Sequence, residues 1–317
     1  MNLRIGSRGS QLALWQANHI AGLLRGQGHS VEIDVIKTTG DRMQEVTFAQ
    51  VGSKGMFTKE IEEALAEGLI DLAVHSLKDL PTELPEPFVL AATPVRVDPR
   101  DVFVSIKHGT LGELPDGAKV GTSSQRRRAQ LKALRPGIDA VEFRGNVDTR
   151  LRKLAEGHVE AILLAAAGLD RLGRTDWVRE RLEPGQFCPA AGQGALGIEA
   201  RKGDDATIAA LAFLDHADTR FAVTAERAAL AALGGGCQVP IGIHCRRELA
   251  RDEMSEGGQE IFGVVASPDS GAIARVHLRS PLDISAETLG RMAATELFEA
   301  GAERLLAAAA ESAGGAA

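Results

Sequence analysis

Hydroxyl and guanidinium groups come together in GTSSQRRRAQ (121–130), where a short apolar strand is expected to lead into a helix. Backbone N–H groups at a helix N-terminus bind anions, and the three hydroxyls ahead of the arginines add further donors. The alternative is a capped helix with a solvated basic first turn. Because positive charge at that end opposes the helix dipole, the pattern favours an anion-binding site.

Two more arginines flank the next expected junction between strand and helix, in VEFRGNVDTRLRK (141–153). Arg144 ends the strand, and Arg150 lies at the start of the helix. Guanidinium groups bind carboxylates through two parallel hydrogen bonds, which suits a ligand with several carboxylates. Surface ion pairs with Glu142 and Asp148 explain the same residues equally well, so the alternatives stay open here.

A third polar group follows an apolar strand in VHSLKDLP (74–81). Ser76, Lys78 and Asp79 come at the carboxyl end of this strand, where α/β proteins bind their ligands. A carboxylate among arginines could stabilise a developing cation or exchange a proton with it. The commoner role of such an aspartate is that of a turn or cap residue, and the motif alone does not exclude it.

Other segments bring cations and hydroxyls to comparable positions. Arg8 and Ser10 lie at the first expected junction between strand and helix, and Lys54 lies on the loop KGMFTKE (54–60). This convergence favours one cleft for an anionic ligand between two similar units.

Cys237 stands in GGGCQVP (234–240), behind three glycines. A glycine turn gives a thiol exposure but supplies no base, and the nearest histidine, His244, lies in an expected strand. An inert buried thiol, a nucleophile and a tether for a covalent group all remain possible. With Cys188 and Cys245 the chain has three cysteines and no CxxC pair, which fits neither a disulfide framework nor a zinc site.

The order of expected elements predicts an α/β fold. Short apolar runs alternate with helical patterns over the first two thirds of the chain, in two units of similar plan. The segment RVDPR (96–100) is a plausible crossing between them. A helix over 219–233, a strand, a hairpin and one long alanine-rich helix to the terminus then predict a small α+β domain.

Composition excludes some classes of partner. A net charge of −7 over 317 residues argues against nucleic acid as the main partner, whereas the local arginines suit a smaller anion. The N-terminus lacks the pattern of a secretory signal, and no stretch of about 18 apolar residues predicts a membrane span. We therefore expect a cytoplasmic protein.

Taken in order, these motifs resemble the porphobilinogen deaminase (hydroxymethylbilane synthase) family of tetrapyrrole biosynthesis. The resemblance runs through RIGSRGSQLALWQA, KGMFTKEIE, HSLKDLPTELP, DPRDVFVS, GTSSQRRRAQL, FRGNVDTRLRKL, AAAGLDRLG, PAAGQGALGIE and ERAALAALGGGCQVPIG. It covers nearly the whole chain apart from the final hairpin and helix.

The resemblance implies three domains. The first two would be built like type 2 periplasmic binding proteins, and the third would be a small α+β domain that carries the cofactor cysteine. Domain 1 would comprise 1–95 with about 195–212, domain 2 would comprise 100–190, and domain 3 would comprise 217–317.

The resemblance also implies a chemistry. Cys237 would hold a dipyrromethane cofactor through a thioether, and Asp79 would be the catalytic carboxylate. Asp79 would assist loss of ammonia from porphobilinogen, stabilise the azafulvene cation, and help to remove the proton after the growing chain attacks. Four cycles would give hydroxymethylbilane, with no metal, in an enzyme expected to be a monomer.

Every added ring brings an acetate and a propionate, which accounts for the arginines. By resemblance, the cofactor acids would be held by Lys78, Ser124, Arg126 and Arg127. Substrate and growing chain would be held by Arg8, Ser10, Lys54, Phe57, Arg144, Arg150, Arg171 and Gln193.

Two other functions agree with part of this pattern. A bilobed binding protein for a carboxylated small molecule explains the arginines, but not a cysteine on a third domain. A cysteine-dependent acyl transferase needs a partner base that the sequence does not reveal.

Overall fold

The fold is described from a computed structural model, over residues 1–39, 58–235, 239–248 and 257–314. By its internal contacts the chain divides into two compact units: 1–97 with 194–220, and 98–193 with 221–317. Within the described residues, no helix is long and apolar enough to span a membrane.

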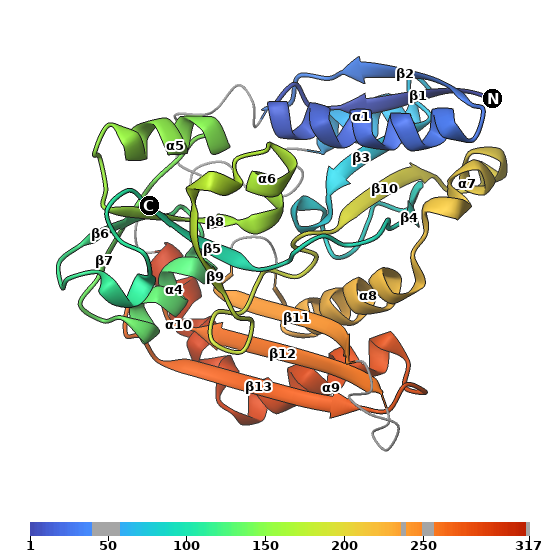
Figure 1. Cartoon of the computed structure of the whole chain (residues 1–317). Coiled ribbons are helices and arrows are strands. Elements are labelled where there is room, and N and C mark those ends of the chain that lie inside the picture. The colour runs from blue at the N-terminus through green and yellow to red at the C-terminus, as the bar shows by residue number, and fades with distance from the viewer. Residues whose placement is uncertain (40–57, 236–238, 249–256, 315–317) are drawn as a thin grey trace. The chain divides into compact units, whose positions relative to one another are not determined.

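The first unit is built on a five-stranded sheet of order β2-β1-β3-β10-β4 (Figure 1). β1 runs parallel to β2 and to β3, whereas β10 is antiparallel to β3 and β4. The strands are β1 (Asn2–Ser7), β2 (Ser30–Val35), β3 (Leu72–Ser76), β4 (Phe88–Ala92) and β10 (Leu196–Arg201).

Helices cover both faces of this sheet. α1 (Gln11–Gly26) begins at Ser10, whose side chain accepts a hydrogen bond from the Ala13 amide, and it buries Ile20 and Leu24 on the sheet. α3 (Lys59–Ala66) packs on the opposite face. The unit also contains η2 (Leu77–Asp79), α7 (Asp205–Leu211) and η5 (Ala212–Leu214).

The second unit contains a sheet of the same design, of order β7-β6-β8-β5-β9. β6 is parallel to β7 and β8, and β5 is antiparallel to β8 and β9. Each sheet thus has three parallel strands, followed by an antiparallel strand and an edge strand. The strands are β5 (Asp101–Ser105), β6 (Lys119–Gly121), β7 (Asp139–Val141), β8 (Ala161–Ala165) and β9 (Val178–Leu182).

Helices again cover both faces of the second sheet. One apolar cluster joins Leu131 of α4 to Phe103 and Leu163 of the sheet, and another joins Leu151 of α5 to Val102. The helices are α4 (Gln125–Leu134), α5 (Val147–Ala155) and α6 (Ala166–Arg171), with short turns η3 (Leu111–Glu113) and η4 (Thr175–Trp177).

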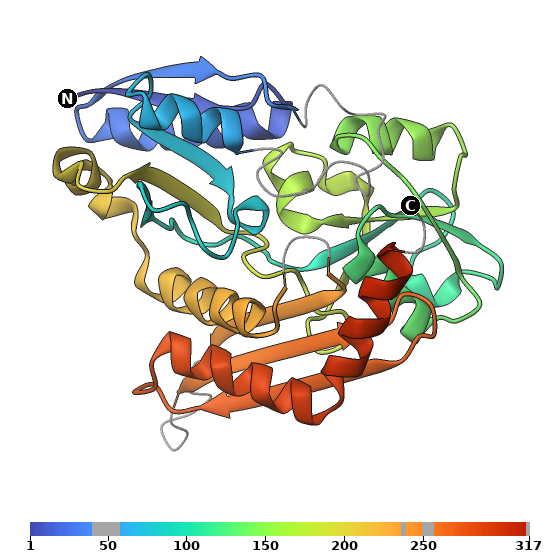
Figure 2. The same cartoon turned by 180° about the vertical axis from the view of Figure 1, so that it is seen from behind.

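The C-terminal part of the second unit is α+β. β11 (Ile241–Glu248), β12 (Gly258–Ala266) and β13 (Ile273–Ser280) form an antiparallel sheet. α9 (Ala286–Glu299) lies along one face of it (Figure 2), and α8 (Ala217–Ala232) and α10 (Ala302–Gly314) contribute to the same core.

The predicted α/β class and the α+β C-terminal part are confirmed, as is the hairpin of β12 and β13. The single helix expected at the terminus is wrong, because Gly301 with φ of 95° separates α9 from α10. Glycine adopts this left-handed conformation readily and so ends the helix.

Two helical glycines differ in the space available for a side chain, so their replacement by alanine should have opposite effects. A Cβ at Gly290 would overlap the Ala225 carbonyl oxygen, whereas one at Gly22 would meet no heavy atom within 4 Å. Gly290→Ala should lower the free energy of unfolding by about 2 kcal/mol, since α8 and α9 must move apart. Gly22→Ala should raise it by about 0.5–1 kcal/mol through helix propensity. Urea denaturation measures both, and an equal effect of the two would contradict this packing.

Candidate functional site

Polar residues of the first unit gather at one edge of its sheet. β1 and β3 are parallel neighbours, paired at Ile5 with Leu72 and at Gly6 with Ala73, so their carboxyl ends meet at the same edge. Arg8 and Ser10 follow β1, and the segment 76–79 follows β3. The structure therefore brings the predicted Arg8, Ser10, Lys78 and Asp79 to one edge.

The turn that carries Asp79 is held firmly. Gln16 of α1 donates to the Ser76 hydroxyl at 2.8 Å, and the Leu77 amide donates to the Ala195 carbonyl at 3.0 Å. A Cβ at Gly197 would come within 2.8 Å of the Leu77 side chain, so glycine there lets the turn pack against β10. Asp79 itself is exposed, at the end of η2. The turn thus presents a carboxylate to solvent from a fixed position.

A buried histidine–glutamate contact that the sequence did not reveal lies directly before this turn. His75 Nε2 is 3.0 Å from Glu199 Oε2, and both residues are buried. Burial raises the pKa of nearby Glu62, and the charge of Glu199 raises it further. The one sequence signal was a glutamate inside the apolar strand of GALGIEA.

The second sheet places its predicted residues at the equivalent edge. The carboxyl ends of the parallel strands β6, β7 and β8 meet there. The segments that follow them carry Ser124, Arg126 and Arg127 (after β6), Arg144 and Arg150 (after β7) and Arg171 (after β8). Ser124 caps α4 by accepting a hydrogen bond from the Arg127 amide.

Arg126 and Arg127 both bind Asp101, the first residue of β5. Arg126 donates from Nη1 at 2.6 Å and from Nη2 at 3.2 Å, and Arg127 donates from Nη2 at 2.7 Å and from Nε at 2.9 Å. All three side chains are buried. Burial alone would raise the pKa of Asp101, but the two arginines hold it well below its usual range. Sequence reasoning assigned Asp101 no role.

Gln193 reaches the same carboxylate. Its Nε2 donates to Asp101 Oδ1 at 3.0 Å and to the Pro99 carbonyl at 2.7 Å. The chain passes between the two compact units at 97–98, at 193–194 and, within α8, at 220–221. The first two crossings are therefore anchored at Asp101 on their second-unit side.

Arg150 presents an incompletely paired guanidinium. Its Nη2 donates to the Ser123 hydroxyl at 3.2 Å, while its Nε is buried with no hydrogen-bond partner among the described residues. Burial, followed by the charge of Arg127, lowers its pKa to about 10. Such a group gains from a nearby anion.

The remaining arginines are placed differently. Arg144 Nε donates to Glu142 Oε1 at 2.7 Å, and Arg128 donates to the other oxygen of Glu142 at 3.3 Å. The ion pair considered as an alternative for Arg144 is thus present. Arg171 is buried at the end of α6, and burial lowers its pKa to about 10.

Lys54, Phe57 and Cys237 lie outside the described residues. The strand after Cys237 is fixed by the buried Glu226 of α8, which accepts hydrogen bonds from the Cys245 amide at 2.8 Å and the Gly192 amide at 2.6 Å. Glu226 therefore ties β11 to the second crossing segment.

Comparison with known proteins assigns these features to one family. The family model "Porphobilinogen deaminase, dipyromethane cofactor binding domain" matches residues 3–209, and that of the C-terminal domain matches 220–299. The porphobilinogen deaminase of Trichlorobacter lovleyi is 51% identical over 96% of this chain and 95% of its own. The chain belongs to the porphobilinogen deaminase family.

The porphobilinogen deaminase of Nitratidesulfovibrio vulgaris is 48% identical over 96% of both chains. Among solved structures, the methionine-binding protein MetQ covers 69% of this chain and 91% of its own at 13% identity, with a TM-score of 0.45. That likeness is too distant to add to the strand orders given above.

Enzymes of this family are transferases, also called hydroxymethylbilane synthases, and this chain is one of them. It deaminates four porphobilinogen molecules, joins them on a dipyrromethane cofactor and releases a linear tetrapyrrole. The predicted family and function are confirmed, and a binding protein without catalysis is not favoured.

The residues of this chain fit such a cofactor. Dipyrromethane carries carboxylates, which require cations and hydroxyls. The buried Nε of Arg150 and the hydroxyl of Ser123 beside it are donors suited to a carboxylate.

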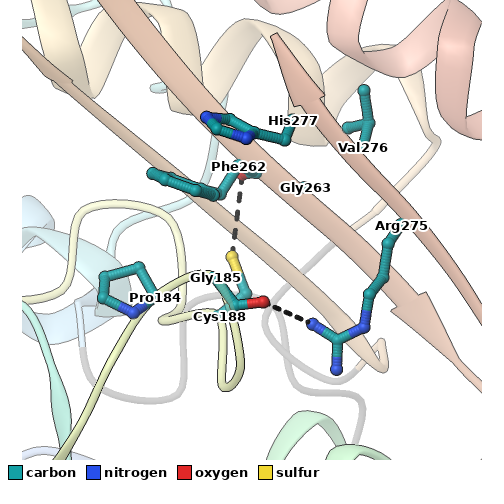
Figure 3. A pocket seen from close by; sticks show the side chains of 8 residues that line it. All are labelled: Pro184, Gly185, Cys188, Phe262, Gly263, Arg275, Val276 and His277. Atoms are coloured by element: carbon teal, nitrogen blue, oxygen red, sulfur yellow. Dashed lines mark hydrogen bonds between the residues drawn. The ribbon is translucent and has the colours of Figure 1, made fainter.

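The surroundings of Cys188 in this chain do not favour catalytic chemistry. It lines a pocket of about 260 Å³, where its Sγ lies 3.6 Å from the Phe262 carbonyl oxygen (Figure 3). Arg275 closes the same region by donating to the Gly185 carbonyl at 3.1 Å. Burial raises the pKa of the Cys188 thiol far above its usual range, which leaves it unreactive.

Arg150→Met should raise the melting temperature of the Cys237→Ser protein, which we expect to lack cofactor, by about 3 °C. The pKa of Arg150 is lower in the fold than in the unfolded chain, so its charge opposes folding at neutral pH. Differential scanning calorimetry measures the shift. Arg152→Met is the control and should change little, because Arg152 is exposed and pairs with Glu156. A fall after Arg150→Met would contradict this account of the site.

Proposed function

We propose that the polar edge of each sheet holds carboxylates of the polypyrrole chain. The observation that carries this proposal is the equivalence of the two edges: Arg8 and Ser10 follow β1 as Ser124, Arg126 and Arg127 follow β6, and β1 and β6 hold the same place in their sheets. An extended ligand with two carboxylates per ring needs cations at several points.

In this proposal Asp79 is the catalytic carboxylate. It stabilises the positive charge that develops on porphobilinogen as ammonia leaves, and it accepts the proton released once the new bond between rings has formed. Its exposure and its rigid turn support this role. When bound, the dipyrromethane supplies the pyrrole carbon to which the first substrate unit is joined.

The other roles divide by position. Lys78, Ser124, Arg126 and Arg127 hold the cofactor acids, and Cys237 attaches the cofactor through a thioether. Substrate and growing chain are held by Arg8, Ser10, Lys54, Phe57, Arg144, Arg150, Arg171 and Gln193. The pairing of Arg126 and Arg127 with Asp101 leaves each guanidinium with donors to spare, since three of its five N–H groups are used.

We further propose a cytoplasmic monomer of three domains, comprising 1–95 with about 195–212, 100–190 and 217–317. The separate family matches over 3–209 and 220–299 support a distinct C-terminal domain. Sedimentation equilibrium tests the oligomeric state.

Intact protein from cells that make porphobilinogen should exceed its sequence mass by two linked pyrrole units. Cys237→Ser should lose this added mass, because no thiol remains to form the thioether. Electrospray mass spectrometry measures both, with Cys188→Ser as the control that keeps the added mass. A wild-type protein of bare sequence mass would count heavily against the proposal.

Asp79→Asn should fold and keep its cofactor, yet lose at least a hundredfold in kcat, which is within the range for removal of a general acid or base. Steady-state assays with porphobilinogen measure the rate. Glu83→Gln changes an exposed carboxylate of the following loop and should leave kcat within twofold. Full activity in Asp79→Asn would remove it from the mechanism.

A further inference from the structure

A fully buried carboxylate offsets part of the charge of the two arginines after β6. Asp101 has no exposed surface, and Arg126 and Arg127 are only 4% and 6% exposed. Arg126 also donates to the Cys188 carbonyl at 2.6 Å, and Arg127 donates to the Leu163 carbonyl at 3.1 Å. Each guanidinium is therefore held in one orientation by neighbours other than a ligand.

The charges do not cancel completely. Two guanidinium groups face one carboxylate, and Arg150, whose pKa Arg127 lowers, adds a further positive charge nearby. Burying an unpaired charge is strongly unfavourable. Any loss of negative charge here therefore lowers the free energy of unfolding. Carboxylates of a bound ligand would relieve the remaining imbalance.

Asp101 is also unable to turn away from the arginines. It begins β5, its backbone pairs with Ala165 of β8, and Gln193 donates to its Oδ1 from the second crossing segment. The carboxylate is therefore a permanent part of the site and holds the guanidinium groups while no ligand is present.

We propose that Asp101 is a positioning residue that stands in for ligand carboxylates, so that the chain folds with Arg126 and Arg127 in place before the cofactor is attached. This inference rests on the proposed function, since it takes these arginines as the site of the cofactor acids. It assigns Asp101 no contact with substrate or cofactor.

The proposal predicts that cofactor and Asp101 partly substitute for one another. In Asp101→Asn the side chain keeps its shape but loses its charge, and only the cofactor can then supply negative charge. The melting temperature should fall by about 10 °C in the Cys237→Ser background and by less than half as much in the cofactor-loaded protein. Calorimetry of the four proteins measures this coupling, which a purely structural role would not produce.

Asp98→Asn is the matched control. Asp98 also binds two arginines, Arg100 at 2.8 Å and Arg181 at 2.7 Å, but it is partly exposed, and neither arginine is among the residues assigned to the cofactor. Asp98→Asn should lower the melting temperature equally in the protein with cofactor and in the protein without it. An equal fall for Asp101→Asn in the two backgrounds, or a larger fall in the loaded protein, would overturn the proposal.

A second variant decides the case in which Asp101→Asn with Cys237→Ser does not fold. Adding Arg126→Gln to that protein removes one positive charge. The net charge of the cluster then returns to its value in the wild-type protein. The resulting protein should fold and give a cooperative melting transition. If it too fails to fold, charge balance is not the role of Asp101 and the proposal is wrong.

Mass spectra of the same samples separate this inference from the proposed function. Added mass that persists in Cys237→Ser would refute the site of attachment, and the inference would fall with it. If the masses are as expected but Asp101→Asn lowers the melting temperature equally with and without cofactor, only the role of Asp101 is refuted and the proposed function stands.

Discussion

The pairing of Asp101 with Arg126 and Arg127 is the interaction on which the rest of the second unit depends. Two guanidinium groups in the first turn of α4 oppose the helix dipole and are removed from water. A carboxylate at the start of β5 makes that burial possible. Because Gln193 joins the same carboxylate, one group of buried charges fixes the arginines and the first two of the three crossings of the chain.

The two sheets share a design that places polar groups at one edge of each. Each has the same strand order and the same strand directions, and each ends its parallel strands in polar residues. The first edge offers the carboxylate of Asp79 as well as the cations Arg8 and Lys78, whereas the second offers mainly cations. In the proposed function this difference separates a catalytic edge from a binding edge.

Local signals in the sequence predicted much of this arrangement. Ser10 and Ser124 were expected at helix starts, and both cap their helices, because a hydroxyl before a helical pattern satisfies a free amide. Strands were predicted from apolar runs, and the polar residues after them were found at the carboxyl edges. Family motifs then supplied the chemistry that these patterns left open.

What the sequence could not reveal depends on distant pairing. Asp101 and Arg127 are joined only by the fold, as are His75 and Glu199, and no spacing rule links them. A charged residue inside an apolar strand, as in DVFVS or GALGIEA, is the only hint that such a partner exists. The break at Gly301 was missed because alanine-rich sequence on both sides favours helix.

A crystal structure of the cofactor-loaded protein tests the central claim most directly. We expect cofactor carboxylates within hydrogen-bond distance of Arg126 and Arg127, with Asp101 still bonded to both arginines. Cofactor acids bound away from these arginines, or an Asp101 carboxylate displaced from them, would contradict the account.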